Sequence, residues 1–194
     1  MKMKICFATH NQNKFNEINS KPGNDFELIS LHDLNVIDEI PETGSTLEEN
    51  SLIKAEYIYL NFDTPVFSDD SGLEVDALQG APGVFSARYA GFPKNDLKNL
   101  ELLLDNMKGV KNRTARFKTV ITLIIDGETH QFTGVVEGHI AHSPSGESGF
   151  GYDPIFIPKG HNITFAQMSM TKKNSMSHRS RAFDKLLAYL NIHY

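Results

Sequence analysis

Residues 66–91 read VFSDDSGLEVDALQGAPGVFSARYAG, a stretch in which short apolar runs alternate with acidic and glycine-rich segments. An apolar run, Pro65–Phe67, leads into the acidic segment 69–72 (DDSG). An alternating apolar run over 73–77 then stops at 80–83 (GAPG). This pattern predicts a strand, a tight acidic turn, a second strand and a rigid loop.

Adjacent carboxylates at such a turn repel each other, so Asp69 and Asp70 need a compensating partner. A hard divalent cation is a common one, because oxygen-ligand sites combine one or two carboxylates with substrate phosphates. Taken alone, the pair is more typical of a solvated acidic turn. Its meaning therefore depends on the other motifs.

The chain has the length and composition of an ordinary globular protein. Its 194 residues fit one domain, or one domain with two lobes, and 40% of them are apolar and 22% charged. The net charge of −5 argues against a nucleic-acid partner, and no apolar run is long enough to span a membrane. The single cysteine, Cys6, excludes an internal disulfide and favours a reducing compartment, so we expect a cytoplasmic protein.

The first predicted strand, Lys4–Ala8, runs into the polar segment 9–14 (THNQNK) and a helix over Lys14–Ser20. Free N–H groups at a helix N-terminus form an anion site, to which Thr9, Asn11 and Lys14 would add polar side chains. The simpler interpretation is a capped helix start.

A second helix is predicted over Leu47–Leu60, behind a Thr-x-x-Glu capping box that begins at Thr46. On it Asn50, Lys54 and Tyr57 share one face by their spacing. A lysine on such a face is usually solvated, and it becomes a site candidate only if the face lines a cleft.

The C-terminal half predicts an amphipathic helix over Asn95–Met107 and a hairpin of strands Ala115–Ile125 and Thr129–Ile140. Together with a short strand at Phe26–Ser30, this hairpin predicts a mixed sheet rather than an all-parallel one.

Two further segments suggest a ligand. The glycine-rich loop 146–154 (GESGFGYDP), followed by a strand-like segment at Ile155–Ile157, carries two aromatic residues for which a flat base is a suitable partner. Ser177 is a predicted N-cap for the last helix, whose first turn carries His178 and Arg179. Positively charged side chains at a helix N-terminus interact unfavourably with the positive end of the helix dipole. A ligand rich in hydrogen-bond acceptors would offset this repulsion. A plain turn and solvent-facing cations remain the alternatives.

Five segments, taken together and in order, resemble the inosine triphosphate pyrophosphatase family. They are FATHNQNK at 7–14, ETGSTLEENSLIKA at 42–55, SDDSGLEVDALQGAPGVFSARYAG at 68–91, SGFGYDPIF at 148–156 and SHRSRA at 177–182. The resemblance implies a single α/β domain over 1–194, with two lobes around a long curved mixed β-sheet flanked by helices and an active-site cleft between the lobes. It also implies a homodimer that hydrolyses ITP, dITP and XTP to the nucleoside monophosphate and pyrophosphate with Mg²⁺.

The resemblance also assigns roles to residues of this chain. Asp70 resembles the proton acceptor that activates water, and Asp70, Glu42 and Asp69 resemble the metal-linked carboxylates. Lys14 and Lys54 would supply positive charge around the polyphosphate. The expected substrate contacts are Thr9, His10, Asn11, Gln12, Asn13, Lys14, Ser71, Phe150, Gly151, Tyr152, Asp153, Lys173, His178 and Arg179. His10 departs from the glycine that many relatives carry there.

The proposed base readers suit a deaminated purine. Hypoxanthine and xanthine present an O6 acceptor where adenine presents an amino group, so donors from His178 and Arg179 would meet another donor in adenine. Guanine shares O6, and the sequence does not identify the residue that rejects it.

Three alternatives remain at this point. A related pyrophosphatase acting on a modified pyrimidine or another damaged nucleotide would share the phosphate chemistry. A catalytically silent nucleotide-binding module would bind without releasing pyrophosphate. A nucleic-acid-binding protein conflicts with the acidic charge balance.

Overall fold

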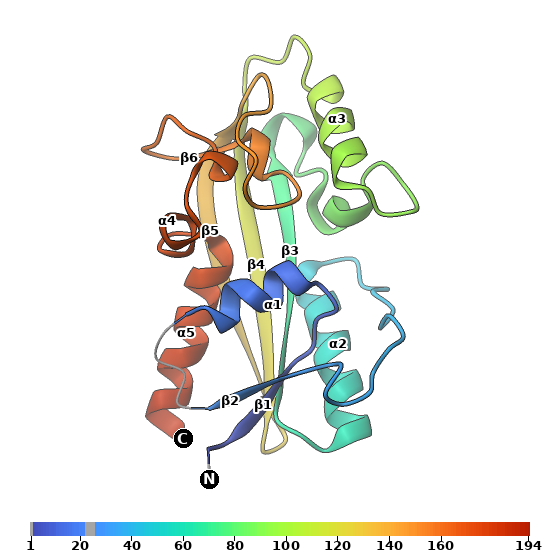
Figure 1. Ribbon diagram of the computed structural model, residues 1–194. Coiled ribbons are helices and arrows are strands. Elements are labelled where there is room, and N and C mark those ends of the chain that lie inside the picture. The colour runs from blue at the N-terminus through green and yellow to red at the C-terminus, as the bar shows by residue number, and fades with distance from the viewer. Residues whose placement is uncertain (1, 22–25) are drawn as a thin grey trace. The chain divides into compact units, whose positions relative to one another are not determined.

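The computed structural model describes residues 2–21 and 26–194, and Figure 1 labels their helices and strands. The strands are β1 (Lys4–Phe7), β2 (Glu27–Ser30), β3 (Val66–Val75), β4 (Thr114–Ile125), β5 (Glu128–Ile140) and β6 (Phe156–Pro158). The helices are α1 (Gln12–Asn19), α2 (Leu47–Phe62), α3 (Asp96–Asn106), α4 (Met170–Asn174) and α5 (His178–His193). Within the described residues, no helix is both long enough and apolar enough to cross a membrane.

The six strands form one mixed sheet in the order β2-β1-β3-β4-β5-β6, which confirms the predicted sheet type. Strand β1 pairs in parallel with β2 and β3, whereas β5 pairs antiparallel with β6. The predicted hairpin turn joins β4 to β5. Asp126 and Gly127 both have positive φ there, 51° and 79°, as a two-residue hairpin turn requires.

The predicted acidic turn is wrong. Residues 69–72 lie inside β3, which runs unbroken for 10 residues. Because successive side chains of a strand point to opposite faces, Asp69 and Asp70 are directed apart rather than against each other. Gly72 serves close packing rather than a turn, since a Cβ there would lie 2.4 Å from the carbonyl oxygen of Gly83.

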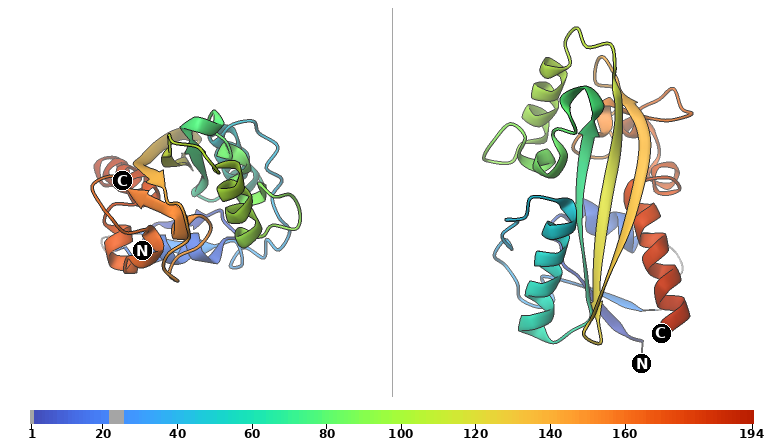
Figure 2. Two further views of the ribbon diagram at one scale, coloured as in Figure 1. Left: turned by 90° about the horizontal axis from the view of Figure 1, so that it is seen from above. Right: turned by 180° about the vertical axis from the view of Figure 1, so that it is seen from behind.

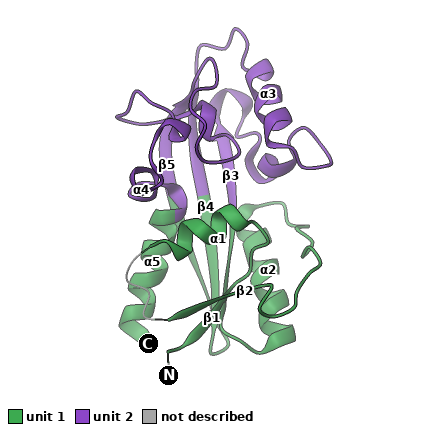
Figure 3. Cartoon of the chain, in the orientation of Figure 1, with its two compact units in different colours: residues 1–70, 119–134, 180–194 green, residues 71–118, 135–179 purple. Residues whose placement is uncertain are grey.

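The chain divides into two compact units, coloured separately in Figure 3. Unit 1 comprises residues 1–70, 119–134 and 180–194, and unit 2 comprises residues 71–118 and 135–179. The boundaries fall within β3, β4 and β5, and near the start of α5.

Unit 1 buries an apolar cluster on each face of its part of the sheet. Alternation along β1 sends Ile5 and Phe7 to the cluster that contains Phe183 of α5, and Cys6 to the cluster that contains Ile58 of α2. Helices α2 and α5 accordingly lie on opposite faces of these strands (Figure 2).

Unit 2 has its own core, to which α3 contributes Leu100, Leu103 and its C-cap residue, Met107. They pack with residues of all the strands that enter the unit and with the segment that follows the glycine-rich loop. The predicted amphipathic stripe is therefore confirmed at these positions, but Leu97, which starts the same stripe, is 63% exposed and lies outside the core.

Candidate active site

The polar turn before α1 is an internally capped helix start. The Asn11 side chain accepts hydrogen bonds from the backbone nitrogens of Asn13 (3.0 Å) and Lys14 (3.2 Å). The backbone nitrogen of Asn11 donates in turn to Thr9 Oγ1 at 3.2 Å. The prediction of free backbone donors is therefore wrong for residues 13 and 14, because an Asn cap satisfies them.

The side chains of His10 and Gln12 in this segment also contact the protein itself. His10 Nε2 lies 3.3 Å from the carbonyl oxygen of Val36, and the Gln12 amide donates to Asn16 at 2.8 Å. The His10 ring thus has a partner of its own in this structure.

Asp69 and Lys14 form a buried ion pair. Lys14 Nζ lies 2.9 Å from Asp69 Oδ2, and the side chains are 13% and 0% exposed. The even–odd alternation of β3 explains the pairing, because Asp69 lies on the same face as Phe67, which packs in the cluster that contains Ile18 of α1.

Lys54 is buried on the opposite face of the same strand. Its ammonium donates to Glu42 Oε1 at 2.7 Å and to the backbone oxygen of Asp69 at 2.6 Å. Burial opposes its charge, but Asp70, Glu42 and Asp69 together outweigh that effect and raise the pKa of Lys54 above its ordinary value. Lys54 is thus a cation in a cluster of carboxylates. Tyr57, predicted on the same face, is instead 43% exposed.

Asp70 is held by Asn50, a residue whose role the sequence did not indicate. The Asn50 amide nitrogen donates to Asp70 Oδ2 at 3.1 Å, while its oxygen accepts from the backbone nitrogen of Gly44 at 2.8 Å. Burial raises the pKa of Asp70, against the opposing effect of Lys54 and Lys14. The carboxyl is therefore fixed in orientation and more basic than an exposed aspartate. Asn50 lies one turn before Lys54, and this spacing is the only signal that pointed to it.

The carboxylates of unit 1 suit a hard cation but do not form a complete cage. In the described part of the chain, no group of three or more His, Cys, Asp or Glu side chains is arranged to hold a metal. Magnesium sites usually take one or two carboxylates and draw their other oxygens from water and phosphate. Asp70 and Glu42 both interact with Lys54, whereas the Asp69 side chain points to the opposite face of β3 and pairs with Lys14. The structure therefore does not gather the three predicted carboxylates around one point.

In unit 2 the glycine-rich loop closes on Asp153. Its Oδ2 accepts from the backbone nitrogen of Phe150 at 2.9 Å and from Lys173 Nζ at 2.7 Å. A Cβ at Gly149, where φ is +80°, would lie 2.1 Å from the same oxygen, so only glycine fits there. The predicted loop residues and Lys173 are brought together.

The Phe150 ring stands close to two buried cations. Lys173 Nζ lies 4.8 Å from its centroid and Arg179 Cζ lies 5.7 Å from it. Arg179, 2% exposed, also donates to Ser71 Oγ at 3.2 Å. The His178 ring stacks on Phe117 at 4.6 Å. An aromatic face and fixed donors therefore gather in one unit, as recognition of a base requires.

Tyr152 has a different role from the one predicted by its place in the loop. The side chain is buried, and its hydroxyl donates to the backbone oxygen of Ser86 at 2.9 Å. It anchors the loop to the segment that follows β3 rather than presenting a second aromatic face.

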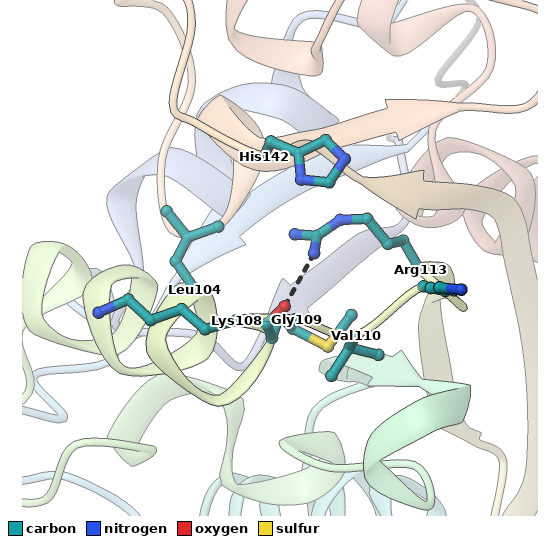
Figure 4. Close-up of a pocket in the computed structure, with 8 residues that line it drawn as sticks. Leu104, Lys108, Gly109, Val110, Arg113 and His142 are labelled. Carbon is teal, nitrogen blue, oxygen red and sulfur yellow. Dashed lines mark hydrogen bonds between the residues drawn. The ribbon is translucent and has the colours of Figure 1, made fainter.

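A cavity of about 540 Å³ lies elsewhere in unit 2, at the C-terminal end of α3 (Figure 4). Its lining includes Lys108, Lys111 and His142, but none of the predicted site residues. Arg113, which also lines it, donates to the carbonyl oxygens of residues 107, 140 and 141, so its guanidinium closes the end of the helix. We do not assign the site to this cavity.

Comparison with known proteins covers nearly the whole chain. Residues 5–189 match the Ham1 family. The chain is 52% identical over 189 residues to the dITP/XTP pyrophosphatase of Christiangramia forsetii, covering 97% of this chain and all of that protein. It is 47% identical over 185 residues to the dITP/XTP pyrophosphatase of Bacillus subtilis, covering 92% of each.

Solved structures agree with this match. The Staphylococcus aureus Ham1 protein superposes with a TM-score of 0.89 at 42% identity, covering 98% of this chain and 100% of that one. A HAM1 protein from Coxiella burnetii gives a TM-score of 0.89 at 37% identity, covering 97% and 98%. These likenesses confirm the predicted fold family.

Proposed function

The chain belongs to the Ham1 family, and we propose on that premise that it hydrolyses deaminated purine nucleoside triphosphates. The substrates are ITP, dITP and XTP, and the products are the nucleoside monophosphate and pyrophosphate. The observation that carries the proposal is the pairing of two chemistries in one chain. Unit 1 holds a carboxylate–lysine cluster around Asp70, and unit 2 holds an aromatic face with buried cations around Phe150.

The phosphate half of the reaction requires charge neutralisation and an oriented water, with little covalent work for the protein. Lys14 and Lys54 would bring two ammonium groups to a triphosphate. Residues 9–13, which directly precede Lys14 in the sequence, carry hydroxyl and amide groups that could add hydrogen bonds. Because both lysines already contact carboxylates, substrate binding redistributes these contacts rather than adding charge to an empty surface.

Magnesium is the proposed cofactor, and Asp70 and Glu42 are the protein carboxylates that would hold it. Asp69, the third predicted ligand, points to the opposite face of β3 and pairs with Lys14, so it is not proposed as a ligand of the same ion. When bound, it supplies positive charge at the phosphate oxygens and favours an ionised or well-oriented water. The carboxylate oxygens of Asp70 and Glu42 support this choice, as does the general reliance of phosphoryl chemistry on the ion.

Asp70 is the proposed proton acceptor. Asn50 fixes its Oδ2 at 3.1 Å, and its raised pKa makes it a better base than a solvated aspartate. Neither a serine nor a cysteine nucleophile is needed. Cys6 is fully buried, and burial raises the pKa of its thiol to about 12, so it stays protonated.

Base selection is assigned to unit 2. Phe150 stacks on the base, while Arg179 and His178, with Lys173 beside them, direct donors to O6 of hypoxanthine or xanthine. Adenine would place its amino group against these donors. A buried donor left without an acceptor is a strong discriminator, on the order of 10⁴ in sites built around hydrogen bonds.

We also propose that the protein works as a homodimer in the cytoplasm.

The test is a substrate panel. Purified protein with Mg²⁺ is incubated with ITP, dITP, XTP, ATP, GTP and modified pyrimidine triphosphates, and both pyrophosphate and monophosphate are measured. We expect fast release from the first three only. Equal turnover of ATP and ITP would rule out base selection, preference for a modified pyrimidine would favour the related pyrophosphatases, and binding without release would indicate a silent module.

A further inference from the structure

We propose that Asp96 is a positioning residue for base selection. Its carboxylate holds the peptide group of Gly151 and thereby keeps the Phe150 ring where a base would stack. This inference rests on the proposed function, because it concerns how that reaction distinguishes one base from another. The sequence indicated only a core-packing helix at this position, and none of the motifs includes Asp96.

The geometry consists of two consecutive N–H groups held by two different carboxylates. The backbone nitrogen of Phe150 donates to Asp153, which is three residues further on. The backbone nitrogen of Gly151 donates to Asp96 Oδ2 at 2.8 Å, across a sequence separation of 55 residues. One bond closes the loop on itself, and the other ties the loop to α3.

Gly151 needs such a tie more than the other glycines of the loop. At Gly146 and Gly149 a Cβ would lie within 2.3 Å of neighbouring atoms, so packing restricts the backbone at both positions. At Gly151, where φ is +60°, no heavy atom outside residues 150–152 lies within 4 Å of the Cβ position. A glycine in open space has wide conformational freedom, so the hydrogen bond to Asp96 supplies the restraint that packing does not.

The restraint acts on the residue that faces the base. Phe150 and Gly151 share one peptide group, so fixing its N–H limits the backbone rotations that would move the Phe150 ring. Those rotations would carry the ring away from Lys173 Nζ at 4.8 Å and Arg179 Cζ at 5.7 Å. A base stacked on Phe150 would then no longer place its O6 atom next to the donor groups of the site.

Helix α3 is a rigid platform for this purpose. Asn95 caps it by accepting from the backbone nitrogen of Lys98 at 2.9 Å, and the Asp96 carboxylate suits the positive end of the helix dipole. Asn99, three residues along the same face, accepts from Ala90 at 2.7 Å and donates to Ala87 at 3.0 Å. The first turn of α3 thus holds two loops of unit 2 at once.

The kinetic test compares Asp96→Ala and Asp96→Asn with wild type. For Asp96→Ala we expect the ratio of kcat/KM for ITP to that for ATP to fall about threefold to tenfold, which corresponds to the net contribution of one ordinary hydrogen bond. Most of this change should appear as a higher KM for ITP rather than as a lower kcat. Asp96→Asn keeps an acceptor oxygen and recovers most of the ratio. The matched control is Asp105→Ala on the same helix, whose carboxylate pairs with exposed Lys108 at 2.7 Å, and it should leave the ratio unchanged.

An unchanged ratio in Asp96→Ala would overturn the proposal. So would an equal loss on both substrates with a lowered melting temperature, which is the result of a purely structural role.

A second measurement needs no turnover. In glycine-labelled protein, amide hydrogen exchange at Gly151 should accelerate in Asp96→Ala and stay near the wild-type rate in Asp105→Ala. Unchanged protection at Gly151 would overturn the proposal. If wild type released no pyrophosphate from ITP, the proposed function would fail, while this exchange experiment would still decide whether Asp96 orders the loop.

Discussion

Two neighbouring carboxylates of β3 should respond in opposite ways to the same substitution. Asp70→Asn is expected to abolish most activity and leave stability unchanged or improved, whereas Asp69→Asn is expected to destabilise the fold. The cluster of unit 1 contains two cations, Lys14 and Lys54, and three carboxylates, those of Glu42, Asp69 and Asp70. Either substitution removes one negative charge and leaves two cations facing two carboxylates. A difference in stability or activity between the two variants therefore reflects the contacts of each side chain rather than the net charge of the cluster.

The magnitudes follow from the environment of each carboxyl. Asp69 is fully buried and pairs directly with Lys14 at 2.9 Å. Breaking a fully buried pair costs about 3–5 kcal/mol, and partial rehydration of Lys14 lowers the expected loss to roughly 2–3 kcal/mol. At Asp70, 7% exposed, burial already disfavours the ionised form and raises its pKa. A neutral isostere that still accepts from Asn50 should change stability by less than about 1 kcal/mol. Loss of a proton acceptor lowers kcat by about 10²–10⁴-fold.

Urea unfolding and pyrophosphate release from ITP measure the two effects on the same preparations. Wild-type turnover in Asp70→Asn, or a loss of stability as large as that of Asp69→Asn, would contradict the roles given to these two carboxylates. A stable and active Asp69→Asn would show instead that the Lys14 pair contributes neither to folding nor to catalysis.

Three further predictions concern selectivity, packing and pH. Arg179→Ala should lower the ratio of kcat/KM for ITP to that for ATP by a larger factor than it raises the KM for either nucleotide. An unchanged ratio would exclude Arg179 as a base reader. Gly72→Ala should lower the free energy of unfolding by about 1–3 kcal/mol, because its Cβ would lie 2.4 Å from the backbone oxygen of Gly83, as urea denaturation would reveal. Burial raises the pKa of the Cys6 thiol to about 12, so its contribution to stability is complete below the unfolded-state pKa and is lost as pH rises towards 12. Between pH 9 and 11, wild type should therefore lose about 1.4 kcal/mol per pH unit more than Cys6→Ala, and parallel losses would contradict this.

The sequence predicted the local elements of the fold well because their signals are local. The turn at Asp126-Gly127, the cap at Thr46 and the start of the last helix at His178 all lie where their residue types place them. The acidic segment was misjudged because its composition is typical of a turn, while its conformation depends on distant partners. Strand β3 accommodates its two carboxylates because cations from two different helices compensate them on opposite faces: Lys14 pairs with Asp69, and Lys54 interacts electrostatically with Asp70.

The same distinction applies to the candidate site. Motif resemblance could propose Asp70, Lys54, Phe150 and Arg179 as site residues, since each lies within a recognisable segment. Asn50 was noted only as a neighbour of Lys54 on one helix face, and its partners, the Asp70 carboxyl and the Gly44 amide, appear only in the folded chain.

Asp96 lies outside every motif, and its partner Gly151 is 55 residues away, so no local pattern could reveal the contact. Residues that meet the substrate are constrained by chemistry and carry a recognisable local sequence. Residues that position them are constrained by geometry, and any residue with an acceptor at the right place in the fold satisfies that constraint. The supporting residues of such a site must therefore be identified from hydrogen bonds in the structure.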